Sequence, residues 1–222
     1  MNQQRGDSVL CVVPARLGST RFPEKMLAPL CGKPLVLHAY ERASRAVRVT
    51  DILIATDDER IARAVEPFGA RWEMTRADHA SGTDRIAEVA ARHPEAAIIV
   101  NVQGDEALID PEVVDAVIQA LTEDPEAAIT TAACPIREPE RQDDPNVVKV
   151  VCDTRGCALY FSRARIPHVR DAADADNARY LQHLGLYAYR RDRLMAFAAL
   201  PQTPLDSIIA GMEAIMNGDD VQ

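Results

Sequence analysis

Two glycine motifs that often mark phosphate binding are absent from this sequence. No GxxxxGK[ST] run occurs, and Gly18 stands alone where a dinucleotide-binding fingerprint would need GxGxxG. The five cysteines include no CxxC pair, and Cys11 lies inside an apolar run. We therefore expect all five to be buried thiols in a reducing compartment.

A basic surface and a long apolar segment are also missing. The chain carries 34 acidic and 25 basic residues, which disfavours sequence-independent binding to nucleic acid because such binding depends on neutralising phosphates. Neither a signal-peptide core nor an apolar stretch of membrane-spanning length is present. The sequence predicts a soluble, cytoplasmic protein without nucleic-acid or membrane partners. Any anionic ligand must then be held by a local group of cations.

Apolar runs of strand length alternate with stretches of helical period in the first half of the chain. The runs Val9–Val13, Ile52–Thr56 and Ala97–Val102 are nearly continuous, as in parallel strands covered on both faces. Helical stretches at Pro34–Ala46 and Asp58–Gly69 lie between them. This alternation predicts an α/β fold with a doubly wound, mostly parallel sheet, whose ligands bind beyond the carboxyl ends of the strands.

The second half predicts a smaller, β-rich lobe. The segment NVVKVVCDTRGCALYFSR contains two strand-like runs around the turn Asp153–Gly156, which indicates a hairpin. A further strand candidate, LQHLGLYAYRR, precedes a short helix from about Arg191 to Ala199. The polar stretch RDAADADNARY is predicted to be a surface loop. A lobe built onto the sheet is more economical than two independent domains, so residues 1–222 are predicted to form one domain.

Three cations and a hydroxyl group follow the first apolar run closely. Arg16, Ser19, Arg21 and Lys25 lie in a loop with Gly18. Such a set suits a triphosphate, whose charge is spread over several oxygens that fixed donors and arginine forks can hold. The alternative is a solvated basic loop. The scarcity of lysine argues against it, because the chain has 22 arginines and three lysines, and Lys25 is one of the three.

Six segments that occur in order along the chain resemble one known family. They are VVPARLGSTRFPEKMLAPLCGKPLVLHAYERA, MTRADHASGTDRIAEVA, IVNVQGDEALID, DPNVVKVV, ALYFSRARIP and HLGLYAYRRD. The chain is thereby similar to the 3-deoxy-manno-octulosonate cytidylyltransferases, also called CMP-Kdo synthetases, from residue 9 to about residue 204. A single segment would be weak evidence, whereas six in register are strong evidence.

This resemblance implies a fold and an activity. Residues from about 8 to 135 would form a CTP-binding sheet of the nucleotide-diphospho-sugar transferase type, and residues from about 136 to 190 a lobe for sugar binding and dimerisation. The enzyme would be a homodimer that transfers CMP from CTP to the anomeric hydroxyl of 3-deoxy-manno-octulosonate (Kdo) and releases pyrophosphate, for lipopolysaccharide biosynthesis. Two alternatives stay open: transfer to another acid sugar (amino-Kdo or a sialic acid), and a regulatory CTP-binding protein without turnover.

The resemblance also assigns a nucleotide site. Lys25, Arg16 and Asp105 would be catalytic, with Asp105 as a ligand of Mg²⁺ and Lys25 stabilising charge on the α-phosphoryl group and the departing pyrophosphate. The CTP-binding residues would be Arg16, Ser19, Arg21, Lys25, Met74, Thr75, Arg76, Ser81, Gly82 and Gln103. Position alone leaves other roles open, because Ser81 or Thr83 could cap a helix and an Asp that follows Gly is often part of a turn.

A sugar site would involve the lobe. Its residues would be Gln103, Arg163, His183 and Tyr187. Arg163 would bind the sugar carboxylate through a charge-assisted fork, and His183 and Tyr187 would form hydrogen bonds, although Tyr187 could instead belong to the core. Outside this set, we interpret His79 as a surface histidine and Asp110 as the N-cap of the next helix.

Three residues depart from the family pattern in or near the phosphate loop. Glu24 stands where the family usually has Gly, which places an anion beside Lys25. We expect its carboxylate to point outward or to weaken CTP binding. Met26 and Ala107 replace prolines that are common in the family, and both changes should loosen a turn slightly.

The last residues also differ from the pattern. After LPQTPL, family members continue with a helix rich in Glu, Gln and Arg, a strand and a second metal-binding Asp, whereas this sequence reads DSIIAGMEAIMNGDDVQ. Glu213 cannot be aligned firmly with the helix carboxylates, and Asp219 and Asp220 come too early for the metal ligand. We therefore expect the second metal ligand and part of the dimer surface to be absent.

Overall fold

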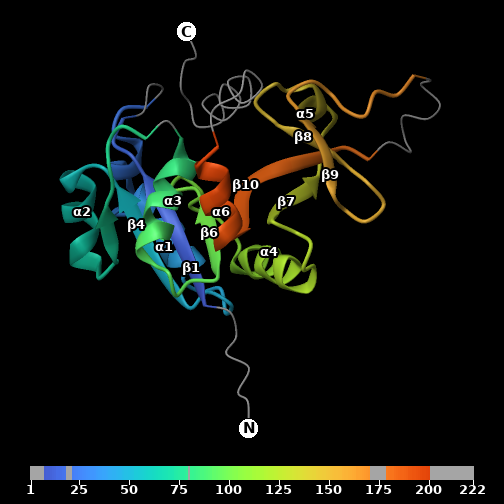
Figure 1. Cartoon of the computed structure of the whole chain (residues 1–222). Helices are drawn as coiled ribbons and strands as arrows, with labels where there is room; N and C mark the ends of the chain where they lie inside the picture. Colours follow the sequence, from blue (N-terminus) through green and yellow to red (C-terminus); the bar gives the residue numbers. More distant parts are fainter. Residues whose placement is uncertain (1–7, 19–21, 80, 171–178, 201–222) are drawn as a thin grey trace. The chain divides into compact units, whose positions relative to one another are not determined.

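The structure is a computed structural model that describes residues 8–18, 22–79, 81–170 and 179–200 of the chain. It divides into two compact units. Unit 1 comprises the chain up to Thr130 and from Leu186 onward, and unit 2 comprises Thr131–Gly185. Strand β10 (Leu181–Arg190) contributes residues to both units (Figure 1).

Unit 1 is built on a sheet with the strand order β5-β4-β1-β6-β10. Its parallel strands are β1 (Val9–Ala15), β4 (Asp51–Thr56), β5 (Trp72–Met74) and β6 (Ile98–Val102). The unit 1 part of β10 runs antiparallel to β6. The predicted doubly wound, mostly parallel sheet is confirmed, because the three apolar runs of the first half form the adjacent strands β4, β1 and β6.

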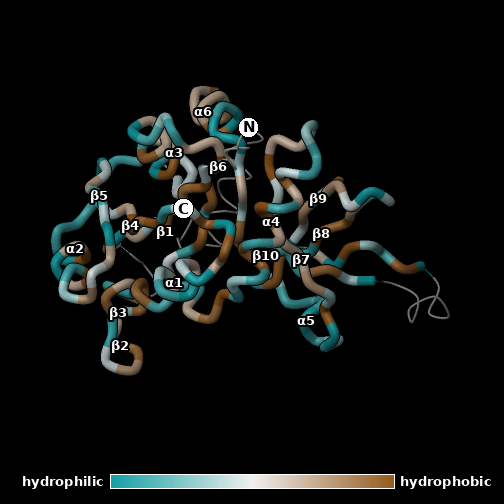
Figure 2. Tube along the Cα trace, turned by 90° about the horizontal axis from the view of Figure 1, so that it is seen from below, coloured by the Kyte–Doolittle hydropathy of each residue, from teal (hydrophilic) through white to brown (hydrophobic). Residues whose placement is uncertain are grey.

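Helices pack against this sheet. They are α1 (Leu35–Ala43), α2 (Glu59–Val65), α3 (Gly82–Arg92), α4 (Pro111–Glu123) and α6 (Arg191–Ala198). Helices α3 and α6 cover the face that presents Leu10, Val12 and Leu53, whereas Cys11 and Val13 point to the other face because side chains alternate along a strand. Every residue of β1 is buried, and Figure 2 shows the hydrophobic colouring along β1 and β4. No described helix is long and apolar enough to cross a membrane.

Local sequence signals set where these helices begin and end. Asp58 caps α2 by accepting a hydrogen bond from Arg60 N–H, and a 3₁₀ turn, η2 (Glu66–Phe68), follows the helix. Gly69 ends that turn with a φ of 73°, a left-handed conformation that glycine adopts without strain. Asp110 caps α4 in the same way as Asp58 caps α2, which confirms the N-cap predicted there.

A short irregular stretch joins β1 to α1. It contains the 3₁₀ helix η1 (Lys25–Leu27) and a small hairpin of β2 (Pro29–Leu30) and β3 (Lys33–Pro34). Cys31 and Gly32 form the hairpin turn, with φ values of 49° and 81°. Two successive positive φ values are typical of a type I′ turn, whose twist matches that of the paired strands.

Unit 2 contains short elements around its own small core. They are the strand β7 (Ile129–Pro135), which begins in unit 1, the helix α5 (Pro139–Asp143), the strands β8 (Lys149–Cys152) and β9 (Ala158–Ser162), and the first half of β10. The side chain of Asp153 accepts hydrogen bonds from the N–H groups of Arg155 and Cys157, which closes the turn between β8 and β9. The predicted hairpin is therefore confirmed. The predicted loop RDAADADNARY falls largely on residues 171–178, outside the described residues.

The prediction of five buried thiols is wrong for four of the five cysteines. Cys11 is buried in β1, and burial raises the pKa of its thiol to about 12. Cys31 and Cys157 are exposed in hairpin turns, and Cys134 and Cys152 are partly exposed. A cysteine count cannot distinguish a strand interior from a turn, because the residue type is compatible with both.

Arg190 at the end of β10 holds carbonyl groups in the last turn of α4 and in the stretch that follows it. Its guanidinium donates to the carbonyl oxygens of Leu121, Ala127 and Asp124 at 2.8, 2.9 and 3.1 Å. Arg190→Met should lower the free energy of unfolding by about 1–3 kcal/mol, because it leaves partly buried acceptors without a donor. Urea unfolding measures this loss. Arg193→Met is the matched control, since Arg193 is exposed and contacts the neighbouring Asp192 at 3.7 Å; an equal loss in the two variants would contradict the prediction.

Candidate active site

Lys25 and Asp105 meet beyond the carboxyl ends of two adjacent strands. Lys25 opens η1 after β1, and Asp105 follows β6, which pairs with β1. Lys25 Nζ donates a hydrogen bond of 2.5 Å to Asp105 Oδ2, and their side chains are 37% and 34% exposed. Arg16 directly follows β1 at the same edge. Residues far apart in sequence thus form an accessible polar group at the edge where open α/β sheets bind ligands.

Glu24 does not pair with the neighbouring Lys25. Its carboxylate accepts a hydrogen bond of 2.7 Å from Arg60 at the start of α2. The backbone of Glu24 has a φ of 56°, in the left-handed region that glycine adopts without strain, which gives a physical reason for glycine at this position in the family pattern. The expectation that this carboxylate points away from Lys25 is confirmed.

Gly104 allows the end of β6 to approach the phosphate loop closely. Gln103 and Gly104 connect β6 to Asp105. A Cβ atom on Gly104 would stand 2.8 Å from the carbonyl oxygen of Pro14 and 2.9 Å from the sulfur of Met26. The first contact is with the backbone of β1, so a larger residue could be accommodated only if the turn after β6 moved away from β1. The absence of a side chain at Gly104 is thus required for the approach that brings Lys25 to Asp105.

Glu106 adds a second carboxylate beside Asp105. Partial loss of hydration raises its pKa, the charge of Asp105 raises it further, and Lys25 opposes the shift. The residue as a whole is exposed. Within the described part of the chain, no three His, Cys, Asp or Glu side chains gather as a metal-binding group. A divalent cation at Asp105 would therefore need oxygen atoms from a ligand and from water, which suits Mg²⁺ because this ion keeps several waters.

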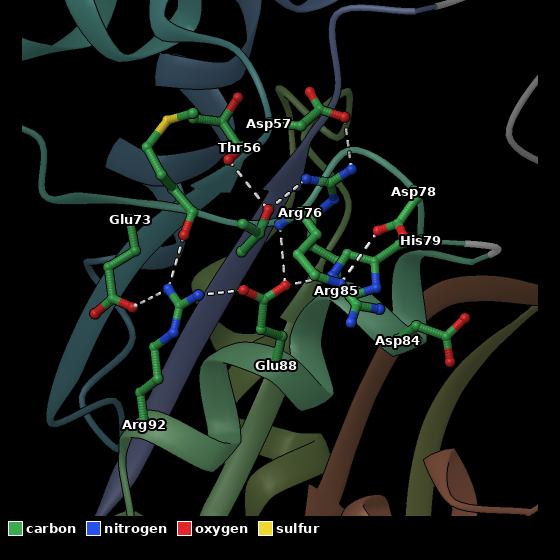
Figure 3. Close-up of polar contacts among 12 residues, drawn as sticks. Thr56, Asp57, Glu73, Arg76, Asp78, His79, Asp84, Arg85, Glu88 and Arg92 are labelled. Carbon is green, nitrogen blue, oxygen red and sulfur yellow. Dashed lines mark hydrogen bonds and ion pairs between the residues drawn. The ribbon is translucent and has the colours of Figure 1, made fainter.

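Thr75 is fixed to the sheet by a hydrogen-bond network whose other members, Thr56 and Arg85, are labelled in Figure 3. Its N–H and its hydroxyl both donate to the carbonyl oxygen of Thr56, at 2.8 and 3.1 Å. Arg85 on α3 donates to the Thr75 hydroxyl and forms an ion pair of 2.7 Å with Asp57. Arg85 is only 4% exposed, so its charge is balanced by Asp57. Sequence reasoning missed Arg85, because an arginine near a helix start looks like a surface residue.

Glu88 on α3 holds the residues that follow Thr75, namely Arg76 and His79. Its carboxylate accepts a hydrogen bond of 3.0 Å from Arg76 N–H and contacts the ring of His79 and the guanidinium of Arg92. Burial alone would raise the pKa of Glu88, but the bonds from Arg76 and His79 and the charge of Arg92 lower it overall. The side chain of His79 is 5% exposed. The prediction of a surface histidine is therefore wrong, because Glu88 supplies a partner that makes burial possible.

Ser81 begins α3 as its N-cap. Its hydroxyl accepts from Asp84 N–H, and the Asp84 carboxylate accepts from Ser81 N–H, which forms a capping box. The predicted helix cap at Ser81 is confirmed. A Cβ atom on Gly82 would meet no atom within 4 Å, so open space adjoins this backbone. Met74 ends β5 and is 37% exposed. The nucleoside contacts assigned to this segment stay a prediction.

The predicted sugar-binding residues occupy different units. Arg163 follows β9 in unit 2 and donates from Nη1 to the carbonyl oxygen of Pro145 at 2.5 Å. His183 is buried on β10, also in unit 2, with Nε2 2.9 Å from the hydroxyl oxygen of Thr131. Tyr187 lies in unit 1 and packs against the core beneath α3 and α6, as the alternative assignment proposed. Ser19, Arg21, Glu213, Asp219 and Asp220 lie outside the described residues.

Comparisons with known proteins identify a family for the chain as a whole. A family model described as cytidylyltransferase matches residues 10–216. The chain belongs to the cytidylyltransferase family. A 3-deoxy-manno-octulosonate cytidylyltransferase of Syntrophotalea carbinolica is 48% identical over 219 residues, which cover 95% of this chain and 87% of the relative. A protein of the same name from Solibacter usitatus is 50% identical over 212 residues, which cover 95% and 83% of the two chains.

Two solved structures share the fold. The structure of CMP:2-keto-3-deoxy-manno-octonic acid synthetase complexed with CTP matches with a TM-score of 0.85 and 42% identity, over 95% of this chain and 87% of that one. The 4-diphosphocytidyl-2C-methyl-D-erythritol synthase of Anaerococcus prevotii matches with a TM-score of 0.58 at 12% identity, over 93% and 82% of the two chains. The resemblance carried by the six sequence segments is therefore confirmed.

Gly104→Ala should impair the site more than the fold. The added methyl group would clash with the carbonyl oxygen of Pro14 in β1, so the turn that carries Asp105 would have to shift relative to β1 and Lys25. We expect kcat/KM for CTP to fall about 10-fold or more. Steady-state kinetics and thermal unfolding measure the two effects. Gly69→Ala is the control, because it strains a left-handed residue that precedes β5 at the amino ends of the strands. If both variants lost kcat/KM equally, the loss would reflect general destabilisation.

His183 should make stability depend on pH. Burial lowers the pKa of its imidazole to about 4, whereas an unfolded histidine has a pKa of about 6.5. Between these values the unfolded chain binds a proton that the folded chain does not, so stability falls as the pH falls from about 6.5 towards 4. From pH 7.5 to pH 5 this amounts to about 2 kcal/mol. Urea unfolding of the protein and of His183→Asn checks it, since the variant should lose less stability over that range.

Proposed function

We propose that this protein transfers CMP from CTP to Kdo. The anomeric oxygen of Kdo attacks the α-phosphorus of CTP, a new P–O bond to the sugar forms, and the bond to the departing pyrophosphate breaks. The hydroxyl proton passes to water. The supporting observation is the contact between Lys25 and Asp105 at the carboxyl edge of the sheet, in a chain of the cytidylyltransferase family. The product, CMP-Kdo, would serve lipopolysaccharide biosynthesis.

Lys25 and Arg16 have the charge that this transfer requires. Phosphoryl transfer depends on positioning and on neutralising the charge of the phosphate oxygens, more than on a nucleophile from the protein. The chain has a net charge of −9, so attraction for CTP must come from a local group of cations. Arg16 after β1 and Lys25 on η1 supply two of them, and Ser19 and Arg21 of the same loop would contact the phosphates as well.

Asp105 fits the role of a Mg²⁺ ligand. It is a partly exposed carboxylate beside a second one, Glu106, at the edge where the phosphates would lie. A bound Mg²⁺ would neutralise charge on the phosphate oxygens. Asp105 has a further function in the protein alone, because its contact with Lys25 holds that ammonium group in place before the nucleotide binds.

The segment Met74–Gly82 would recognise the nucleoside. Thr75 is tied to Thr56 and Arg85, and Arg76 N–H is tied to Glu88, so α3 and the sheet hold Thr75 and Arg76 in place. A preorganised backbone can present N–H and C=O groups to the edge of cytosine at little entropic cost. Met74, Thr75, Arg76, Ser81, Gly82 and Gln103 are the residues assigned to this contact.

Arg163 would supply the positive charge for the sugar carboxylate. His183 has its pKa lowered to about 4 by burial, so it is neutral at pH 7 and would act through a hydrogen bond. The hydroxyl of Thr131 donates to the carbonyl oxygen of Leu184 at 3.3 Å, which leaves its oxygen to accept from His183 Nε2–H. Gln103 and Tyr187 complete the proposed sugar-binding set.

We also propose a cytoplasmic homodimer without nucleic-acid or membrane partners. Leu159 and Tyr160 on β9 are 67% and 64% exposed. Because side chains alternate along a strand, the two lie on opposite faces of β9. Each is a large exposed apolar side chain that a second protein surface could cover, and this supports a dimerising role for the lobe.

A pyrophosphate-release assay with CTP, Mg²⁺ and Kdo tests the proposed function. Lys25→Ala and Asp105→Asn should each lower kcat by roughly 100-fold, comparable to removing one preorganised charge-stabilising group. Lys33→Ala is the matched control, because Lys33 forms an ion pair of 2.5 Å with Glu41 away from this contact, and its rate should stay near that of the unmodified protein. Near-normal rates for both site variants would contradict the assignment.

The same assay distinguishes the alternative functions. Replacing CTP by ATP or GTP should abolish most of the rate, because a site that hydrogen-bonds one base leaves its polar groups unpaired with another. Faster turnover with amino-Kdo or a sialic acid than with Kdo would identify that sugar as the substrate. Tight binding of CTP without pyrophosphate release from any acid sugar would identify a binding protein.

A further inference from the structure

Lys149 is a fully buried lysine at the start of β8. It is 0% exposed, and its ammonium group donates to three backbone carbonyl oxygens. Those of Asp144 and Val147 are at 2.9 Å, and that of Arg163 is at 2.6 Å. A lysine ammonium has three N–H donors, so every donor of Lys149 has an acceptor. All four residues belong to unit 2.

Burying an ammonium group costs free energy, even when all of its donors are hydrogen-bonded. A lysine at this position therefore needs a role that an apolar side chain could not fill. Loss of hydration lowers the pKa of Lys149, while the charges of Asp144 and Asp143 oppose the shift. The three acceptors come from two segments that are distant in sequence, the stretch Asp144–Val147 and Arg163 after β9. A leucine or methionine would fill the same space but would tie neither segment to the other.

Arg163 is linked to the stretch Asp144–Val147 in two ways, through Lys149 and directly. Its backbone carbonyl accepts from Lys149, and its guanidinium donates from Nη1 to the carbonyl oxygen of Pro145 at 2.5 Å. Lys149 therefore fixes both the backbone of Arg163 and the stretch on which its guanidinium rests. Because a bidentate arginine fork depends on orientation, a displacement of about 1 Å in either part would weaken its grip on a carboxylate.

We propose that Lys149 is a positioning residue that holds Arg163 in the orientation needed to bind the carboxylate of the acid sugar. The proposal rests on the proposed function, in which Arg163 binds that carboxylate. Lys149 acts through Arg163 and makes no contact with the sugar. Its loss should therefore affect recognition of the sugar and leave recognition of CTP, which depends on residues of unit 1, unchanged.

The test compares Lys149→Met with Lys33→Met. Both remove a lysine and leave a side chain of similar length, but Lys33 pairs with Glu41 in unit 1. Initial rates are measured against Kdo at saturating CTP and against CTP at saturating Kdo. Lys149→Met should raise KM for Kdo about 10-fold and change KM for CTP less than 2-fold, whereas Lys33→Met should change neither. An equal rise in both KM values would show a general structural role and would overturn the proposal.

A double-mutant cycle with Arg163→Ala separates this proposal from the proposed function. If Lys149 acts through Arg163, the rise in KM for Kdo caused by Lys149→Met should largely disappear in the Arg163→Ala background. A large effect of Arg163→Ala with none from Lys149→Met would overturn the positioning role and leave the sugar site in place. No effect of Arg163→Ala would overturn the sugar-site assignment of Arg163, and the proposal about Lys149 with it.

Two further variants keep the test decisive if Lys149→Met does not fold. Lys149→Arg keeps a cation with several N–H donors, and Lys149→Gln keeps two neutral donors. The KM for Kdo should rise in the order unmodified protein, Lys149→Arg, Lys149→Gln, with thermal unfolding measured alongside to confirm that each variant is folded. Folded variants with an unchanged KM for Kdo would overturn the proposal.

Discussion

The contact between Lys25 and Asp105 is the interaction on which the candidate site depends. As a partly exposed ion pair it contributes about 0–1 kcal/mol to stability, so its importance lies in position. Parallel pairing of β1 with β6 brings the two loops to one edge, and the bare backbone of Gly104 lets them touch. Glu24 could compete for the ammonium of Lys25, but its left-handed backbone and its contact with Arg60 direct it elsewhere.

Much of the fold could be predicted because its signals are local. The runs that became β1, β4 and β6 are continuously apolar, and such runs rarely have another use in a chain of this composition. Asp110 and Ser81 could be recognised as helix caps, since a short polar side chain before a helical stretch satisfies the first free N–H groups. The hairpin around Asp153 follows from the same kind of local hydrogen bonding.

The parts that could not be predicted depend on partners distant in sequence. His79 has the sequence surroundings of a surface residue, but the fold places Glu88 beside it. Arg85 is buried because Asp57 and Thr75 accept its hydrogen bonds. The exposure of Cys31 follows from its place in a hairpin turn and not from its chemistry. For the site itself, the resemblance supplied the residues, and the structure supplied the reason why some of them lie together: a close approach of backbone that no residue pattern encodes.

The different surroundings of the three lysines simplify chemical labelling of their amino groups. Lys149 is sealed from solvent, whereas Lys25 and Lys33 are each more than one third exposed. A water-soluble acylating reagent therefore meets two lysine side chains in the described part of the protein, one at the candidate phosphate site and one beside Glu41. Lys33 is thus an internal standard in every labelled sample, and the ratio of modification at the two positions would report occupancy of the proposed nucleotide site without any assay of turnover.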